Sequence, residues 1–539
     1  MVQPIQIQPH QIEHFKRIVD ILRREFAYLD VSPFGSGKTH ITLAIAATFK
    51  LNLIVICPKS VMENWKKWTE IYGINLIYIT TYQSLRGQSC YSLNHPLLVR
   101  TGDVYRATDA FENYVKGKLL LVFDEYHNVK NDNSQLASAH ALIKSLTRLV
   151  RMGYKSRIAL LSATPCDVRD TVTSTFKMLG IILSNKLYSY NRSTKEYELL
   201  GIQEAISKCN SYDPDETFTI ACRSVNKTTA KTMCYDLYIR VLKKYIVSSM
   251  PCPPIDAVKD AKNYYVLMPK KDIERLKEGL SLFKSATNYK HSTKKVDYSK
   301  ANWGDINTSR MEIDSAKINS VARLAKENLE QNKSCKVLIY CNYKRDMARV
   351  KELLAEYSPL LMDGSTSGKT RKLTVELFQQ DNDDYRVFIS NPKVGGIGID
   401  LDDKYGTRPR IMYILPSYFY IDQFQACGRI FRVGTTSKAT IRFIYSRAFP
   451  YETGIINSMT TKSDVHRNMV TKEQENIKFP GEYEELLELT GEEKETGNIQ
   501  NMVIDIPDND ISCKQLLRSN ETNKPTNNES TQKITASAL

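Results

Sequence analysis

Short, continuous runs of apolar residues recur through the first third of the chain, each followed by a segment of helix-forming residues or a turn. The runs lie at 26–31, 51–57, 77–81, 118–123 and 157–161. Their length is that of strands, and a continuous apolar run is typical of a central strand in a parallel sheet. Apolar positions from 11 to 25 recur at helical spacing and predict an amphipathic helix before the first strand. The pattern indicates an α/β domain.

A second pattern of strands and helices starts near residue 317. It predicts a helix over 317–331, a strand over 336–341, a helix over 344–356 and a strand over 386–390. At 539 residues the chain is long enough for two or three domains. We therefore expect two α/β domains in tandem.

Residues 181–315 separate the two patterns and carry no catalytic motif that can be named. They include an apolar helical segment at 235–246 and a Lys-rich polar stretch at 289–300. We expect an insertion and linker here, whose basic residues either track a nucleic-acid backbone or form a solvated face. After Ser446 the pattern fades, and residues 497–539 are rich in Asn, Thr and Ser, which predicts disorder.

The charge of the chain favours a polyanionic partner. Lys and Arg number 75 and Asp and Glu number 60, so the formal net charge is 75 − 60 = +15. Residues 482–495 hold seven Glu and one Lys, so the remainder is more basic than the total indicates. Nucleic acid is the simplest partner, although charge alone fits any basic soluble protein equally well.

The cysteines and the apolar runs bear on the compartment. The 11 Cys include no C-x-x-C pair, and Cys57 and Cys341 lie in apolar runs, which favours reduced, buried thiols over disulfides or a zinc site. The N-terminus has no apolar signal core, and the longest apolar runs are too short to span a membrane. We expect a soluble, intracellular protein that does not bind membranes.

The segment 31–39 reads as a strand end, a glycine loop and a helix start. It follows the pattern G-x-x-x-x-G-K-[ST], except that Ser32 stands where the first Gly belongs. Gly35, Ser36 and Gly37 would let backbone N–H groups point at phosphate oxygens at the helix N-terminus. Lys38 would reach the β- and γ-phosphates, and the Thr39 hydroxyl would ligate Mg²⁺.

Two further groups of polar residues follow buried strands. Asp124, Glu125 and His127 come about 85 residues after the glycine loop, at the end of an apolar run. Asp124 is suited to hold Mg²⁺, Glu125 to orient or deprotonate the attacking water, and His127 to link the γ-phosphate to the rest of the protein. The hydroxyls of Ser162 and Thr164, after the last run, are placed to couple these residues to a second lobe.

The second pattern ends in closely spaced glycines and arginines. Gly395, Gly396, Gly398 and Asp400 follow the strand at 386–390, and glycines there let the backbone approach a phosphate or the other lobe. Gln425-Ala-Cys-Gly-Arg429-Ile-Phe-Arg432 matches Q-x-x-G-R-x-x-R. We expect the two arginines to share one helix face and to neutralise charge on the γ-phosphoryl group.

Several other polar residues are candidates for ligand binding, but their sequence patterns are less specific. Gln11 either reads the adenine edge or is a solvated residue at a helix start. Pro58, Lys59 and Ser60 suit a nucleic-acid phosphate, since a Lys and a hydroxyl lie at a strand end beside helix N–H groups. Thr81 follows the next strand. Residues 364–370 look like a second phosphate loop but have one residue too few between the glycines.

The motifs, in this order, resemble those of superfamily 2 helicases. Gly35 to Thr39, Asp124 to His127 and Ser162 to Thr164 look like motifs I, II and III, 394–401 looks like motif V, and 425–432 like motif VI. VICPKSVMENW (55–65), ITTYQSL (79–85) and DEYHNVKN (124–131) resemble Swi/Snf-type double-stranded DNA translocases. Helicases of large DNA viruses show a similar mixture of features.

This resemblance implies a fold, ligands and an organisation into domains. It implies two tandem RecA-like domains, at 1–180 and 316–460, with the insertion at 181–315 and a tail at 461–539 that is first acidic and then of low complexity. ATP and Mg²⁺ would bind between the domains, with Gly398 and Asp400 near the nucleotide. Pro58, Lys59, Ser60, Thr81, Gly364, Gly395 and Gly396 would contact nucleic acid. We expect a monomeric motor with a possible protein partner at its tail.

The track is the open question. Swi/Snf-type features favour movement along duplex DNA without strand separation. Ser162-Ala163-Thr164 in place of Thr-Gly-Thr, Asp400 in place of Asn, and Tyr126 in place of a small residue depart from that type. A helicase that separates DNA or RNA strands, for example in viral transcription, is therefore an alternative. A non-catalytic nucleic-acid-binding scaffold with a degenerate motor is a second one.

Overall fold

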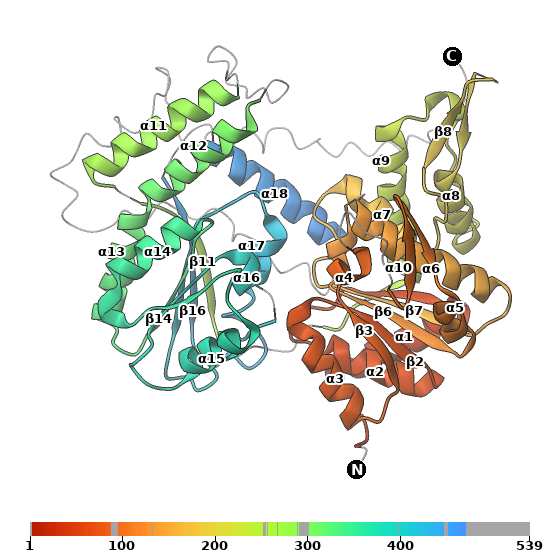
Figure 1. The fold of residues 1–539 in the computed structure, drawn as a ribbon, viewed down its shortest axis with the longest axis horizontal. Helices are drawn as coiled ribbons and strands as arrows, with labels where there is room; N and C mark the ends of the chain where they lie inside the picture. Colours follow the sequence, from red (N-terminus) through yellow and green to blue (C-terminus); the bar gives the residue numbers. More distant parts are fainter. Residues whose placement is uncertain are drawn as a thin grey trace.

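The chain folds into two α/β lobes, each built on a six-stranded parallel sheet (Figure 1). The computed structural model describes residues 3–470 apart from 88–94, 132, 194, 252–254, 256, 267, 288, 290–300, 397 and 447–450. The expected tail from 471 onward therefore lies outside the described residues. The predicted fold class of two parallel sheets flanked by helices is confirmed.

Lobe 1 contains the first sheet. From one edge to the other its strands are β10 (Val247–Ser248), β1 (Ala27–Asp30), β7 (Arg157–Leu161), β6 (Leu119–Asp124), β2 (Asn52–Ile56) and β3 (Leu76–Thr80). All pairings within it are parallel. The five predicted strands are all present, and the two-residue strand β10 is an addition that no apolar pattern indicated.

Alternation along the strands of lobe 1 divides its core into two layers. Leu120 and Val122 of β6 pack on one face, under α1 (Ile12–Arg24), α2 (Lys38–Phe49) and α3 (Met62–Ile71). Leu121 and Phe123 pack on the other. That face is covered by α4 (Tyr82–Arg86), α5 (Asp109–Lys116), α6 (Ser134–Arg151), α7 (Val172–Met178), α8 (Gly201–Tyr212) and α9 (Lys227–Leu237). Successive strand residues point to opposite faces, so burial on both faces produces the continuous apolar runs.

Lobe 2 contains the second sheet. Its strands, in order, are β11 (Lys259–Tyr265), β16 (Ala439–Tyr445), β15 (Arg410–Ile414), β12 (Lys336–Tyr340), β14 (Val387–Ser390) and β13 (Leu360–Met362). Its helices are α11 (Lys270–Ala286), α12 (Trp303–Ala316), α13 (Ile318–Gln331), α14 (Lys344–Leu353), α15 (Gly368–Gln379), α16 (Pro392–Gly395), α17 (Tyr420–Cys427) and α18 (Tyr451–Met469). Helix α18 crosses residue 460, where we placed the end of the second domain.

Residues 181–315, expected as an insertion and linker, contribute to both sheets. They add β10 to lobe 1 and β11 to lobe 2, so the crossing between the lobes lies between Ser248 and Lys259. The segment also supplies a π-helical turn at Tyr238–Leu242 and α10 (Lys243–Tyr245). Two small antiparallel hairpins complete lobe 1: β4 (Leu98–Thr101) with β5 (Val104–Ala107), and β8 (Tyr188–Asn191) with β9 (Glu196–Leu199).

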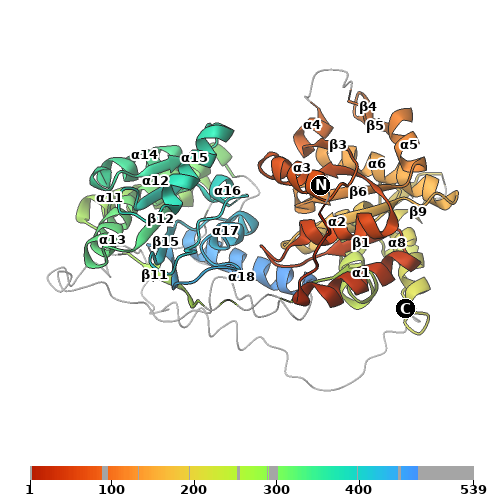
Figure 2. The same cartoon turned by 90° about the horizontal axis from the view of Figure 1, so that it is seen from below.

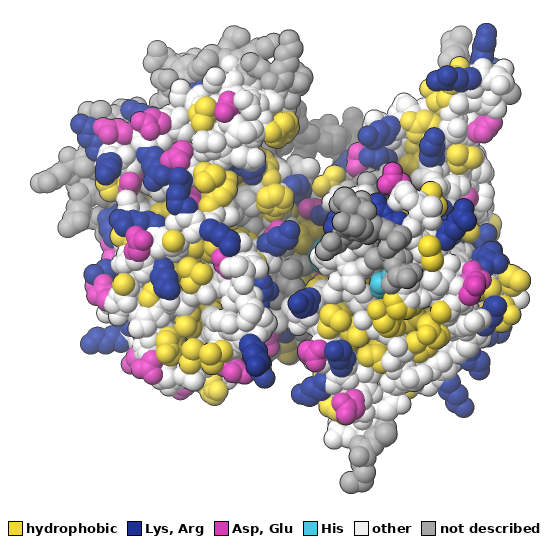
Figure 3. Space-filling model, viewed as in Figure 1, with side chains coloured by type: hydrophobic (Ala, Val, Ile, Leu, Met, Phe, Trp, Pro, Cys, Tyr) yellow, Lys and Arg dark blue, Asp and Glu magenta, His cyan; other side chains and the backbone are white. Residues whose placement is uncertain are grey.

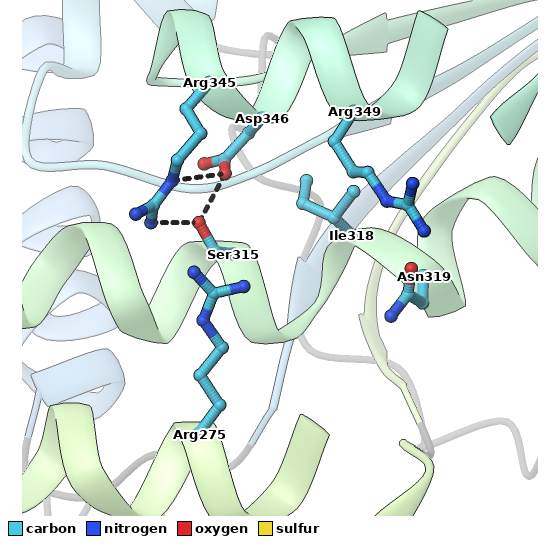
Figure 4. Close-up of a pocket in the computed structure, with 7 residues that line it drawn as sticks. All are labelled: Arg275, Ser315, Ile318, Asn319, Arg345, Asp346 and Arg349. Carbon is cyan, nitrogen blue, oxygen red and sulfur yellow. Dashed lines mark hydrogen bonds and ion pairs between the residues drawn. The ribbon is translucent and has the colours of Figure 1, made fainter. Parts of the chain in front are cut away.

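An ion-pair cluster fixes the α11–α12 hairpin to α14. Arg275 of α11 and Arg345 of α14 both donate to Glu312 of α12, at 2.6 and 3.0 Å. Arg345 also donates to the Ser315 hydroxyl at 2.6 Å, and Arg349 pairs with Glu352 at 3.1 Å. These guanidiniums border a hollow of about 240 Å³ (Figure 4). Because each of these guanidiniums pairs with a carboxylate, we interpret the cluster as a structural contact between the helices.

We expect acid to destabilise lobe 1 through His140. Its Nε2 donates to the Ile182 carbonyl at 2.8 Å, and burial lowers the pKa of His140 to about 4. The pKa of histidine in an unfolded chain is near 6.5. The contribution of neutral His140 to the free energy of unfolding is therefore complete above about pH 6.5 and is lost as the pH falls toward 4. In urea unfolding, wild type should lose on the order of 2 kcal/mol more than His140→Gln between about pH 7.5 and pH 5. Equal losses in the two proteins would contradict this assignment.

Candidate active site

The glycine loop turns from β1 into α2 as the sequence predicts. Gly35 and Gly37 have φ of 73° and 96°, a backbone conformation that favours glycine, and α2 starts directly at Lys38. The Lys38 ammonium lies against the loop and donates to the carbonyls of Ser32 and Pro33 at 2.9 and 3.0 Å. Ser36 and Thr39 lie in the same turn. This is a strand–loop–helix arrangement suited to phosphate groups.

Ser32, the departure from the motif, is held by a buried network. Its backbone N–H donates to the Asp30 carboxylate at 2.9 Å and its hydroxyl donates to the same oxygen, while Met250 N–H donates to the Ser32 hydroxyl at 2.9 Å. His14 lies 3.1 Å from Asp30 and 2.8 Å from the hydroxyl of Ser248. Burial alone would raise the pKa of Asp30, but His14, Lys38 and Ser32 hold it below its usual range. The Ser32 hydroxyl, at the position where the motif usually has glycine, therefore takes part in this hydrogen-bond network.

Gln11 is buried against the glycine loop, so the solvated alternative does not apply. Its amide Nε2 donates to the Ser36 carbonyl at 2.9 Å, and its Oε1 accepts from the Gln8 N–H at 3.0 Å. A Cβ on Gly37 would lie 2.3 Å from that Nε2, so the close approach of the Gln11 amide requires glycine at this position. Gln11 thus holds the glycine loop in place.

Asp124 lies at the end of β6, with its side chain and backbone both anchored. The indole N–H of Trp65 donates to its carboxylate at 2.8 Å, and the Tyr82 hydroxyl donates to its backbone carbonyl at 2.8 Å. Burial and repulsion from Glu125 raise the pKa of Asp124 to about 6, against the opposing effects of Trp65 and Lys38. The Trp65 indole therefore fixes the orientation of the Asp124 carboxylate at the end of β6.

Glu125 is held in the left-handed region, with φ of 53°. Its carboxylate lies 3.3 Å from Nδ1 of His127 and 3.5 Å from the Ser162 hydroxyl. Burial would raise the pKa of Glu125, but His127, Lys38 and Arg429 together hold it below its usual range. The side chain is therefore ionised and positioned next to the glycine-loop lysine.

His127 joins three of the predicted motifs. Its Nδ1 lies 3.0 Å from the Ser162 hydroxyl and 3.4 Å from the Thr164 hydroxyl, and its Nε2 lies 3.4 Å from Nε2 of Gln425 in lobe 2. The residues after β6, after β7 and on α17 are thus brought together across the boundary between the lobes. The predicted coupling role of Ser162 and Thr164 has a physical route through His127.

The arginines of lobe 2 face the glycine loop. A Cβ on Gly35 would lie 3.1 Å from Nη2 of Arg432. The Arg429 guanidinium lies 5.6 Å from the centre of the Phe34 ring, and Phe34 itself packs on Phe424 at 5.8 Å between ring centres. Burial lowers the pKa of Arg429, and the opposite charge of nearby Glu125 acts against this shift.

The expectation that Arg429 and Arg432 share a helix face is wrong. Helix α17 ends at Cys427, and Arg429 N–H bonds to Ala426, so the chain continues in tight turns. The break occurs at Gly428, a poor helix former, where a Cβ would lie 3.1 Å from the Phe34 ring. The turns still direct both guanidiniums toward the glycine loop.

The motif with Gly395 to Asp400 divides into buried and exposed parts. Gly395 is buried against Tyr340, and Gly396 is buried against α17. Gly398, with φ of 68°, is exposed, and a Cβ on it would lie 2.9 Å from the Ser60 hydroxyl. Asp400 pairs with Arg432. The Asp400 carboxylate therefore orients the Arg432 guanidinium.

The other residues predicted to contact nucleic acid are more exposed. Lys59 and Ser60 are exposed at the end of β2, beside the partly exposed Pro58. Thr81 caps α4 by accepting from Ser84 N–H at 3.1 Å. Gly364 lies in an open turn before α15, with no atom near its Cβ position. These positions are separate from the cleft described next.

A cleft of about 730 Å³ lies between the lobes beside His127 and Gln425. Its walls carry four cationic side chains, Lys130, Arg310, Lys393 and Lys462, and two carboxylates, Asp422 and Asp167, of which Asp167 pairs with Lys130. Phe419, 64% exposed, and the rings of Tyr343 and Tyr418 also line it. Figure 3 shows Lys and Arg side chains on both sides of the boundary between the lobes. The cleft thus offers charge for phosphates and flat rings for bases.

Some residues of the site escaped sequence reasoning. Trp65, Phe34 and the pair His14–Asp30 bear directly on the glycine loop or on Asp124. Trp65 lies in the VICPKSVMENW segment and Phe34 in the glycine-loop segment 31–39, but neither pattern assigned the side chain a role. The others act through contacts between segments far apart in the chain.

Comparison with protein families gives two matches. The DEAD/DEAH box helicase model matches residues 8–171, and the helicase conserved C-terminal domain model matches residues 317–434. The first span holds the glycine loop and the residues around Asp124 and Ser162. The second holds the glycines and arginines that face them.

Similar proteins include viral and chromatin-associated ones. The "Putative ATP-dependent RNA helicase L364" of Acanthamoeba polyphaga mimivirus is 24% identical over 84% of this chain and 82% of its own. The chromodomain-helicase-DNA-binding protein 1-like of Danio rerio is 20% identical over 82% of this chain, which spans only 43% of that relative. The Sulfolobus solfataricus SWI2/SNF2 ATPase core in complex with dsDNA is 15% identical, over 88% of this chain and 98% of that one, at a TM-score of 0.29.

No helix among the described residues is both long and apolar enough to cross a membrane. The two helicase models lie in order on the two lobes, and the residues that they contain meet at one boundary. The chain belongs to the superfamily 2 helicases, ATP-hydrolysing enzymes, and is similar to their Swi/Snf-type and viral members.

Proposed function

We propose that this helicase binds ATP with Mg²⁺ between its lobes and uses hydrolysis to move along nucleic acid, with duplex DNA as its track. The observation that carries the proposal is the approach of Arg432 from lobe 2 to Gly35 in the glycine loop of lobe 1. A nucleotide held there is contacted by both lobes, so loss of its γ-phosphate changes how they fit together.

The side chains divide the work at the nucleotide. Lys38 and the loop N–H groups bind the phosphates, and Arg429 and Arg432 neutralise the charge that develops on the γ-phosphoryl group. Asp124 and the Thr39 hydroxyl are hard oxygen donors of the kind that Mg²⁺ prefers, and one or two protein ligands suffice for that ion. Mg²⁺ would shield the phosphate charge when bound. Ionised Glu125 accepts a proton from the attacking water.

The cleft beside His127 is suited to one strand of the track. Lys393 is exposed there, and Lys462 of α18 donates to the Tyr418 carbonyl from the cleft wall. Arg310 lies over the Tyr418 ring at 5.2 Å. Cations contacting one strand would leave the second strand paired, as translocation on a duplex requires. The name of the Danio rerio relative, a chromodomain-helicase-DNA-binding protein, favours DNA as well.

Separation of RNA or DNA strands is the second candidate. The exposed Phe419 ring favours it, because an unpaired base can stack on such a ring. The name of the mimivirus relative favours RNA in particular. The unusual Ser162-Ala163-Thr164 sequence points the same way.

ATP turnover measured with matched nucleic acids tests the proposal. We expect duplex DNA to stimulate phosphate release about tenfold or more at low salt, above single-stranded DNA and RNA, with no strand displacement. The variant Lys393→Ala should lose part of this stimulation, while Lys326→Ala, which removes a partly exposed lysine of α13, should not. Stimulation by RNA alone would reject the duplex track, and strand displacement would favour the second candidate.

A further inference from the structure

Helix α18 belongs to the cores of both lobes. Tyr451, Ile455 and Met459 from its first half are buried in the core of lobe 2. Val465 and Met469 from its second half are buried in the core of lobe 1. Figures 1 and 2 both show α18 running from one lobe to the other. The helix is therefore a rigid connection between the lobes, separate from the linker before β11.

The far end of α18 is anchored to lobe 1 by hydrogen bonds. The Tyr238 hydroxyl donates to the Met469 carbonyl at 2.8 Å, and Lys243 donates to the Asn468 carbonyl at 3.0 Å. The Asn468 amide donates to the Tyr235 hydroxyl at 3.1 Å. A change in the relative position of the lobes must strain or break these contacts.

His466 lies on the last turns of α18 with both ring nitrogens engaged. Its Nε2 lies 2.9 Å from the Ala163 carbonyl, and its Nδ1 lies 2.8 Å from the Tyr420 hydroxyl. A carbonyl oxygen only accepts, so Nε2 carries the hydrogen and Nδ1 accepts from Tyr420. The side chain is 4% exposed, and burial lowers its pKa to about 4, which keeps the ring neutral near pH 7. One neutral tautomer satisfies both partners.

The two partners of His466 belong to segments that act on the nucleotide site. Ala163 lies between Ser162 and Thr164, whose hydroxyls contact His127. Tyr420 begins α17, which carries Gln425, and Gln425 also approaches His127. His466 therefore closes a ring of contacts that starts and ends at His127 and crosses between the lobes twice.

We propose that His466 is a positioning residue that holds the Ser162-Ala163-Thr164 segment and α17 in register, so that the arginines after α17 meet the nucleotide correctly. The proposal rests on the proposed function only in that ATP is hydrolysed at this boundary. His466 touches no reacting group. It acts through Ala163 on one side and Tyr420 on the other.

Replacement of His466 tests this role. His466→Ala removes the donor to the buried Ala163 carbonyl and the acceptor of the buried Tyr420 hydroxyl, and we expect kcat for ATP to fall about tenfold while the KM for ATP stays within about twofold. His466→Gln offers an amide donor to Ala163 and should recover most of the loss. Thr461→Ala, an exposed residue of α18 that bonds only within the helix, is the matched control and should match wild type.

Tyr420→Phe provides a variant that removes one hydroxyl and keeps the ring. It should lower kcat, and its effect should not add to that of His466→Ala, because both break the same connection. Unchanged kcat in a folded His466→Ala, full additivity with Tyr420→Phe, or no recovery in folded His466→Gln would overturn the proposal. If His466→Ala does not fold, kcat of Tyr420→Phe decides.

All these rates are measured with and without nucleic acid. Wild type that no nucleic acid stimulates would contradict the proposed function, and the unstimulated kcat would still decide the role of His466. The two proposals can thus fail separately.

Discussion

Glu125→Gln should reduce kcat for ATP by a factor of about 10²–10⁴, the range typical for removal of a general base. The carboxylate is ionised because His127, Lys38 and Arg429 outweigh its burial. Glutamine keeps the size and the contact with the Ser162 hydroxyl but cannot accept a proton. Phosphate release in single-turnover and steady-state experiments measures the loss.

Nucleotide and nucleic-acid binding separate this effect from misfolding. Both affinities should stay within about threefold of wild type, because the phosphate-binding groups are unchanged. Glu13→Gln, an exposed carboxylate on α1 paired with Lys16, is the matched control. Turnover by Glu125→Gln at the wild-type rate would overturn the assignment of the base.

Arg432→Ala should produce the largest loss, about 10³–10⁵ in kcat, as for other arginines that contact a γ-phosphoryl group from a second domain. Its guanidinium lies next to Gly35 and is oriented by Asp400. Arg429 is a poorer probe, since it also donates to the carbonyls of Gly396 and Ile399 and supports the fold of lobe 2.

The control for Arg432 is Arg349→Ala, which removes an exposed guanidinium paired with Glu352. Arg432→Lys keeps the charge without the planar fork and should recover only part of the rate. Thermal unfolding of all three variants checks that the lobes stay folded. Near-normal turnover by Arg432→Ala would show that the late arginines do not act on ATP.

Short-range patterns were sufficient to predict the central parts of both lobes. The strands β2, β6, β7, β12 and β14 are buried on both faces, so each appears as an apolar run. The glycine loop was equally readable, because its function requires particular residues at particular spacings. These features are encoded within a few neighbouring residues.

What escaped prediction depends on contacts between distant segments. The two-residue strand β10 is too short to show a period, and it exists because Val247 and Ser248 pair with Leu29 and Asp30. Helix α17 ends before Gly428, a poor helix former, and glycine fits there because the Phe34 ring, nearly 400 residues earlier in the chain, fills the space of a side chain. His466 lies in a helix of mixed polarity whose two halves serve different cores.

The hydrogen bond from Met250 N–H to the Ser32 hydroxyl has a mechanical consequence. The start of β11 at Lys259 is nine Cα-to-Cα steps along the chain from Met250 (259 − 250 = 9), and a fully extended chain of that length reaches about 30 Å. The linker that leads to the second sheet is therefore anchored at the glycine loop. Separation of the lobes beyond that reach would break the Met250–Ser32 hydrogen bond, so it would disturb the loop that binds the nucleotide.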